Sequence, residues 1–157
     1  MKHILICGFK GDNNTAKLIL DKIQSNNKLY LENDFKKSVK QLLEVINDYN
    51  FIIMLGQKPV IKSIYIERVG RQNDELLTTT YNIDDLYNYF DNIGYKVVLS
   101  NNAGNYLCNN IYYHCLKYIV DNKKKIQSVF LHVPTISNIF DIDMFAEQLT
   151  EYINNLI

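Results

Sequence analysis

The chain has 157 residues, 47% of them hydrophobic, which is enough for one globular domain with its own core over residues 1–157. Basic and acidic residues balance at 17 each, so charge gives no reason to expect a nucleic-acid or membrane partner. No apolar run approaches the roughly 20 residues of a membrane span, and residues 4–7 are too short a run for a signal peptide. We therefore expect a cytoplasmic protein.

The hydrophobic pattern alternates between strand-like and helix-like segments. The apolar run 4–7 predicts a strand, and the shared face of Leu18, Ile19 and Ile23 predicts a helix over 15–23. A second amphipathic helix is predicted over 35–49. The fully apolar segment that follows it, 51–55, is typical of a strand in the centre of a sheet.

The second half of the chain continues the alternation. Residues 61–69 alternate weakly and predict an extended segment. The remaining pattern predicts, in order, a helix near 83–90, a strand at 96–99, a helix over 105–120, a strand at 128–133 and a helix from about Met144. This order favours an α/β fold, a three-layer α/β/α sandwich with a mostly parallel sheet.

Cys108 is the first candidate for chemistry, because it stands at the predicted start of a helix that follows a strand. A helix N-terminus and a nearby imidazole both favour the thiolate, and the backbone amides there could receive an oxyanion. In parallel sheets, such chemistry gathers where strands end and helices begin. The alternative is a small core residue, because Cys108 shares an apolar helical stripe with Tyr112 and Cys115.

His132 and Glu67 could complete a nucleophile, base and orienting set with Cys108. His132 closes an apolar strand at the sheet edge where we expect Cys108, although a histidine in such a run is often a hydrogen-bonded core residue. Glu67 is out of keeping with its apolar neighbours and could orient the imidazole. An ion pair with Arg68 or Arg71 at the surface is the alternative for Glu67.

The spacing of the remaining residues gives no case for a bound metal or nucleotide. Cys7, Cys108 and Cys115 lack zinc-type spacing and cannot all pair, which suits free thiols in a reducing compartment. Neither a dinucleotide-binding glycine fingerprint nor a P-loop is present in the sequence. We therefore expect no metal and no cofactor.

Five short segments carry a resemblance to the pyroglutamyl peptidase I family, the pyrrolidone-carboxylate cysteine peptidases. They occur in the family's order and are Gly8-Phe9, Gly56-Gln57, Glu67-Arg68-Val69, Ala103-Gly104-Asn105-Tyr106-Leu107-Cys108-Asn109 and Leu131-His132-Val133-Pro134. The resemblance spans nearly the whole chain, and its central motif around the cysteine is the most specific part.

The resemblance implies a Cys-His-Glu triad of Cys108, His132 and Glu67 on a phosphorylase/hydrolase-like fold. It also implies hydrolysis of an N-terminal pyroglutamyl residue through an acyl-enzyme. The expected partner is a small peptide or amide substrate, and the chain could form a homo-oligomer. The residues that match the family's substrate contacts, or that stand directly before the cysteine, are Phe9, Asn14, Gln57, Tyr106 and Leu107.

This sequence looks like a shortened member of that family. The segment after Phe9 lacks the family's second phenylalanine, which would cover the other face of the lactam ring. The family's Ala-x-Asn after Glu67-Arg68-Val69 is replaced by Gly70-Arg71-Gln72, and the long loop at the substrate mouth is largely missing. We therefore expect weak pyroglutamyl peptidase activity or a shift to a different small amide. Efficient cleavage would instead mean that another residue, such as Tyr106 or Tyr65, covers the vacant ring face.

Three functions are compatible with these residues. The first is a cysteine peptidase that removes pyroglutamate, and the second is a cysteine amidase that acts on another small amide or lactam. The third is a non-catalytic relative on the same scaffold. Because all three triad residue types are retained, the sequence favours an enzyme.

Overall fold

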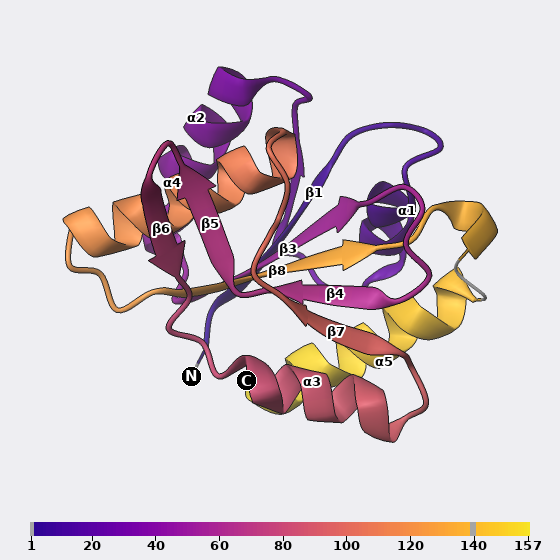
Figure 1. Ribbon diagram of the computed structural model, residues 1–157. Helices are drawn as coiled ribbons and strands as arrows, with labels where there is room; N and C mark the ends of the chain where they lie inside the picture. Colours follow the sequence, from indigo (N-terminus) through magenta and orange to yellow (C-terminus); the bar gives the residue numbers. More distant parts are fainter. Residues whose placement is uncertain (1, 139–140) are drawn as a thin grey trace.

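One six-stranded sheet with helices on both faces organises the chain (Figure 1), and the computed structural model describes residues 2–138 and 141–157. The strand order is β2-β1-β3-β8-β4-β7. The strands are β1 (Ile4–Phe9), β2 (Lys28–Leu31), β3 (Phe51–Gln57), β4 (Ile64–Glu67), β7 (Val97–Ser100) and β8 (Gln127–Val133). β1, β2, β3 and β8 are parallel, whereas β4 runs antiparallel to β8 and parallel to β7.

The helices divide between the two faces of this sheet. They are α1 (Thr15–Lys22), α2 (Phe35–Val45), α3 (Ile83–Asn92), α4 (Leu107–Asp121) and α5 (Ile142–Leu156). Apolar residues of α1, α3 and α5 pack in one cluster against the sheet, and those of α2 and α4 pack in a second cluster on the opposite face. The predicted three-layer α/β/α fold with a mostly parallel sheet is confirmed.

The central strand β3 is apolar throughout because helices cover both of its faces. Ile53 and Leu55 belong to the cluster under α1, α3 and α5, whereas Ile52 and Met54 belong to the cluster under α2 and α4. Successive side chains of a strand point to opposite faces, so a strand covered on both sides needs a continuous apolar run.

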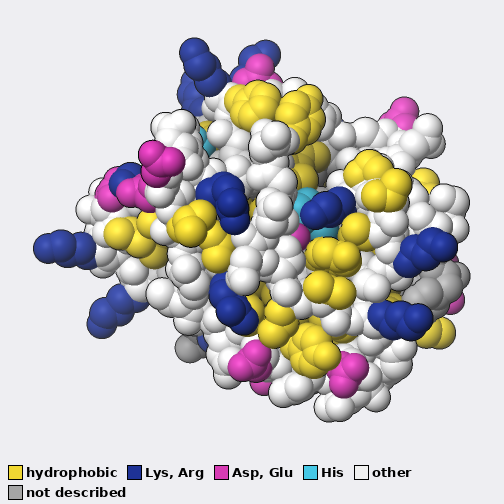
Figure 2. Space-filling view, viewed as in Figure 1, with side chains coloured by type: hydrophobic (Ala, Val, Ile, Leu, Met, Phe, Trp, Pro, Cys, Tyr) yellow, Lys and Arg dark blue, Asp and Glu magenta, His cyan; other side chains and the backbone are white. Residues whose placement is uncertain are grey.

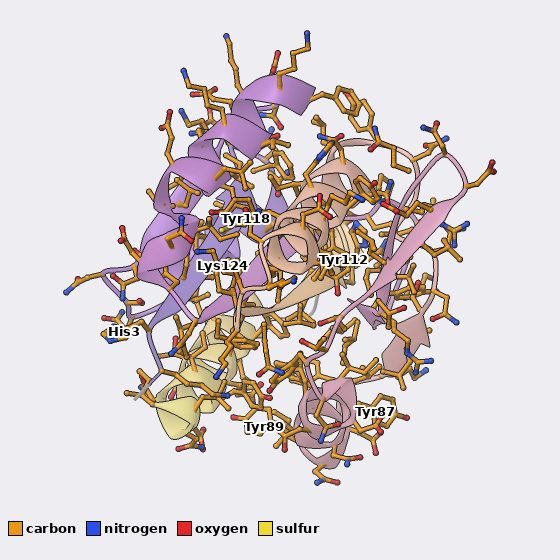
Figure 3. The ribbon with its side chains drawn as sticks, turned by 90° about the vertical axis from the view of Figure 1, so that its left-hand side faces the viewer. His3, Tyr87, Tyr89, Tyr112, Tyr118 and Lys124 are labelled. Atoms are coloured by element: carbon orange, nitrogen blue, oxygen red, sulfur yellow. The ribbon has the colours of Figure 1, made fainter. Side chains whose placement is uncertain are left out.

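α2 and α4 lie side by side over the second face (Figure 3). Tyr118 of α4 holds them together, because its hydroxyl accepts a hydrogen bond from the Asn47 amide at 2.9 Å. The bonded pair joins α4 to the segment that follows α2, which is the short 3-10 helix Ile46–Asp48. The buried apolar cluster beneath α4 packs this helix, which carries Cys108, against the sheet.

Two features of the fold were not predicted from the sequence. One is the edge strand β2. The other is a separate hairpin of β5 (Val69–Gln72) and β6 (Glu75–Thr78), which turns at Asn73 with a positive φ of 53°. The hairpin lies against α4, where a Cβ on Gly70 would stand 2.8 Å from the Tyr113 backbone. Glycine at this position therefore allows the hairpin to approach the helix closely.

The predicted segments otherwise agree with the structure in type and order. The last helix begins at Ile142, two residues before the expected start, and the helix expected over 105–120 is α4. Met1 and residues 139–140, which the predicted domain 1–157 includes, lie outside the described residues. In the described part of the chain, no helix combines the length and apolar character needed to cross a membrane.

Candidate active site

His132 and Glu67 form a buried pair on neighbouring strands. The Nδ1 atom of His132 lies 2.9 Å from Oε1 of Glu67, and the two residues are 3% and 0% exposed. A carboxylate can only accept, so Nδ1 carries the hydrogen and Nε2 is left for a reacting group. This burial excludes the alternative of a surface ion pair between Glu67 and Arg68 or Arg71.

The hydrogen bonds around Glu67 fix its position further. Tyr112 reaches inward from α4 (Figure 3) and donates a hydrogen bond from its hydroxyl to the backbone oxygen of Glu67 at 2.9 Å. The second carboxylate oxygen, Oε2, is buried and has no hydrogen-bond partner within the described residues. The carboxylate therefore spends its only side-chain hydrogen bond on the imidazole.

Cys108 lies on the same face of the sheet as His132. It is the second residue of α4, and its Sγ atom lies only 2.6 Å from the place where a Cβ on Gly56 would stand. Gly56 of β3 is level with His132 of β8 in the parallel register, so both positions face the same side. The missing side chain of Gly56 thus makes room for the thiol beside the imidazole.

The thiol and the imidazole do not form a hydrogen bond with each other among the residues described. Catalytic hydrogen bonds are often long in the unliganded state of an enzyme and shorten when substrate binds. The structure therefore brings Cys108, His132 and Glu67 to one place on the sheet but leaves the final thiol contact to be made.

The route by which Cys108 reaches this place differs from the one we expected. β7, the strand before α4, runs antiparallel to β8, so Ser100 and His132 close strands that point in opposite directions, and Ser100 is level with Phe130 through Glu67 of β4. The expectation of a shared carboxyl edge was therefore wrong. Residues 101–106 bring the chain back over the sheet, and α4 then begins at Leu107.

The electrostatics of Cys108 also correct the sequence-based expectation. Burial raises the pKa of the Cys108 thiol to about 12, the Glu67 charge raises it further, and the Lys58 charge opposes both. The expected thiolate at a helix start is thus overturned, because desolvation and the Glu67 charge outweigh the favourable charge of Lys58. The free thiol is protonated at neutral pH, and it needs a base to become a nucleophile.

The other two cysteines are core residues. Cys7 and Cys115 are both 0% exposed, and burial raises the pKa of each thiol. Cys108 is half-buried, so it is the most accessible of the three thiols.

The first turn of α4 is open to a negatively charged atom. α1, α2 and α5 each have an Asn or Asp cap whose side chain accepts hydrogen bonds from the first-turn amides. α4 has Tyr106 at this position and no side-chain cap. Its first backbone N–H groups, including that of Cys108, are therefore free of a side-chain acceptor and can hold an oxyanion.

Gln57 is held in one orientation at the end of β3. Its Oε1 atom accepts hydrogen bonds from the backbone N–H of Thr15 at 2.8 Å and from the Thr15 hydroxyl at 2.9 Å. Because a backbone N–H can only donate, the amide oxygen must face Thr15. The Gln57 NH₂ group, which has no partner within the described residues, is left to donate to a ligand.

The other predicted substrate contacts lie in different environments. Asn14 caps α1, with its Oδ1 accepting from the amides of Ala16 and Lys17. Phe9 and Leu107 are 4% and 6% exposed and belong to the apolar cluster against which Cys108 packs. They therefore belong to the apolar floor between the sheet and α4, the helix that carries Cys108.

Tyr106 turns outward instead. It is 66% exposed, and its ring packs edge-on against Phe35 with centroids 5.4 Å apart. Tyr65, the other residue considered for the missing ring face, lies opposite His132 in the antiparallel register of β4 and β8. The geometry therefore favours Tyr65 over Tyr106 as an aromatic neighbour of the reacting atoms.

Lys58, whose charge acts on the Cys108 thiol, was not predicted from the sequence as a site residue. Its backbone N–H donates to the Val133 oxygen at 2.9 Å, and its Nζ lies 5.3 Å from the centre of the Tyr65 ring. Figure 2 shows a basic side chain beside a histidine near the middle of this face of the molecule. The sequence signal that could have identified Lys58 is its position directly after Gly56-Gln57.

Comparisons with known proteins agree on one family. The family model described as pyroglutamyl peptidase matches residues 76–147. The pyrrolidone-carboxylate peptidase of Thermosipho melanesiensis is 29% identical over 170 residues, covering 86% of this chain and 84% of the relative. That of Brachyspira hyodysenteriae is 31% identical over 134 residues, covering 70% of this chain and 67% of the relative.

Solved structures of such enzymes share the fold. Pyroglutamyl peptidase I from Bacillus amyloliquefaciens superposes with a TM-score of 0.81 at 18% identity, covering 94% of this chain and 91% of that one. The pyrrolidone carboxyl peptidase of Fervidobacterium islandicum gives 0.83 at 17% identity, covering 98% and 97%. With its fold, its site and a 31% identical relative in agreement, the chain belongs to the pyroglutamyl peptidase family.

Proposed function

We propose that this protein is a cysteine peptidase that removes pyroglutamate from the N-terminus of peptides, with Cys108 as nucleophile, His132 as base and Glu67 as the orienting carboxylate. The observation that carries the proposal is the buried 2.9 Å hydrogen bond from His132 to Glu67, on the sheet face where Cys108 Sγ packs over Gly56. A base held by a carboxylate beside a thiol is the arrangement that acyl transfer requires.

The raised pKa of Cys108 determines the order of the steps. Because the resting thiol is protonated, His132 Nε2 takes the proton as the sulfur attacks the lactam-bearing acyl carbonyl. The oxyanion that forms is held by the first-turn amides of α4. His132 then gives its proton to the leaving amine, and water, deprotonated by the same imidazole, releases pyroglutamate from the sulfur.

Gln57 supports the choice of substrate. Thr15 holds its amide oxygen, so its NH₂ group is oriented to donate to an acceptor such as a lactam carbonyl. Phe9, in the apolar floor with Leu107, supplies a flat surface for the ring.

A second candidate is a cysteine amidase that acts on a different small lactam or amide. The segment between Phe9 and Asn14 contains no second aromatic residue, and Tyr106 turns away toward Phe35. A ring covered on one face loses part of its binding energy, which is commonly worth roughly 10- to 200-fold in specificity.

Turnover of a fluorogenic pyroglutamyl amide tests the proposal. The wild type should release the fluorophore, and Cys108→Ala should remove the activity. The matched control is Cys115→Ala, a thiol on the same helix that is buried away from the reacting atoms and should leave turnover intact. Activity that survives in the Cys108 variant would contradict the mechanism, and a wild type that cleaves only other small amides would favour the second candidate.

A further inference from the structure

Two contacts lie on opposite sides of His132, on the sheet face that carries the imidazole. Cys108 Sγ packs over Gly56 of β3, on one side of β8. Lys58 places its Nζ over the ring of Tyr65 in β4, on the far side of β8. His132 of β8 therefore lies between the Cys108 thiol and the Lys58 contact.

This arrangement gives the substrate a direction, if the proposed function holds. The acyl carbon that Cys108 attacks lies on the β3 side of the imidazole. The leaving amine must face His132 Nε2 to receive its proton, so the residue after pyroglutamate extends toward β4. There it meets the Tyr65 ring and the Lys58 ammonium group.

Lys58 has no carboxylate partner in the part of the chain that the structure describes. Glu67, the carboxylate beside His132, gives its hydrogen bond to that imidazole. Residues 51–66 contain Lys58 and Lys62 but no aspartate or glutamate. A half-buried ammonium that rests on an aromatic ring without a counter-ion is ready to attract an anion.

We propose that Lys58, with Tyr65 beneath it, is a specificity residue that favours peptides with a carboxylate on the residue directly after pyroglutamate. The carboxylate is either an acidic side chain or the free C-terminus of a dipeptide. The inference rests on the proposed function and adds to it the chemical class of the leaving group. The charge of Lys58 also lowers the pKa of Cys108, which places the ammonium within electrostatic reach of the reacting sulfur.

The test compares kcat/KM for two substrates of equal size, pyroglutamyl-glutamate amide and pyroglutamyl-glutamine amide. The wild type should favour the glutamate substrate by about 3- to 30-fold at low salt, and the preference should fall as salt rises because a partly exposed charge pair is screened. Lys58→Met, which keeps the length of the side chain, should bring the ratio close to one. Lys58→Arg should restore a preference.

Lys62→Met is the matched control, because it removes the same charge from the same loop at an exposed position and should keep the preference of the wild type. A wild-type ratio near one would overturn the inference, as would a Lys58→Met variant that slows both substrates equally. The second result would make Lys58 an aid to the thiol instead. If neither substrate were cleaved by the wild type, the proposed function itself would fail.

Discussion

The raised pKa of Cys108 predicts an unusual pH dependence for alkylation of the free enzyme. With a pKa of about 12, the thiolate fraction at pH 8 is about 10⁻⁴, against about a quarter for an ordinary thiol of pKa about 8.5. The greater nucleophilicity of a high-pKa thiolate recovers roughly 40-fold of this difference. Cys108 should therefore react with iodoacetamide on the order of 50- to 100-fold more slowly than a free cysteine at pH 8.

Rates of labelling measured by peptide mass spectrometry between pH 6 and 10 check this prediction. The rate at Cys108 should rise about tenfold per pH unit without a plateau, because the thiol stays far below its pKa throughout. Cys7 and Cys115 are the internal controls and should be labelled later still, since both are fully buried. A plateau below pH 8 would refute the reasoning, because it would show a thiolate already paired with the His132 imidazolium.

Two substitutions test the supports of the thiol and the imidazole. Glu67→Gln keeps an acceptor for His132 Nδ1 but removes the negative charge. We expect kcat to fall by roughly 10- to 10⁴-fold while the circular dichroism spectrum stays native. Unchanged turnover would count against the triad. Gly56→Ala places a methyl group 2.6 Å from Cys108 Sγ and 2.7 Å from the Phe130 ring. This variant should lower the free energy of unfolding in urea by about 1 to 3 kcal/mol and greatly reduce turnover. A variant with the stability and turnover of the wild type would show that the thiol does not need this space.

The sequence by itself determined the layers of this protein. The continuous apolar run of β3 indicated a strand in the centre of the sheet, and the helical periodicity of the segments at α2 and α4 indicated helices that pack on it. These features are local, because side-chain period and run length depend only on near neighbours. The edge strand β2 and the hairpin of β5 and β6 were missed, because short strands with exposed polar residues have no clear period.

The candidate site was predictable in part. The resemblance indicated Cys108, His132 and Glu67, and the structure brings all three to one sheet face. The direction of β7 was not predictable, because the sequence of a four-residue strand does not specify whether its neighbour runs parallel or antiparallel.

Only the tertiary structure decided the electrostatics of the site. The motif around Cys108 suggested a thiolate, but the pKa of a thiol depends on how much water the rest of the chain removes and on which charges lie near it. Burial of Cys108 between α4 and the sheet and the charge of Glu67 raise that pKa, whereas the charge of Lys58 lowers it. These groups come from strands and loops far apart in the sequence, so their combined effect exists only in the folded chain.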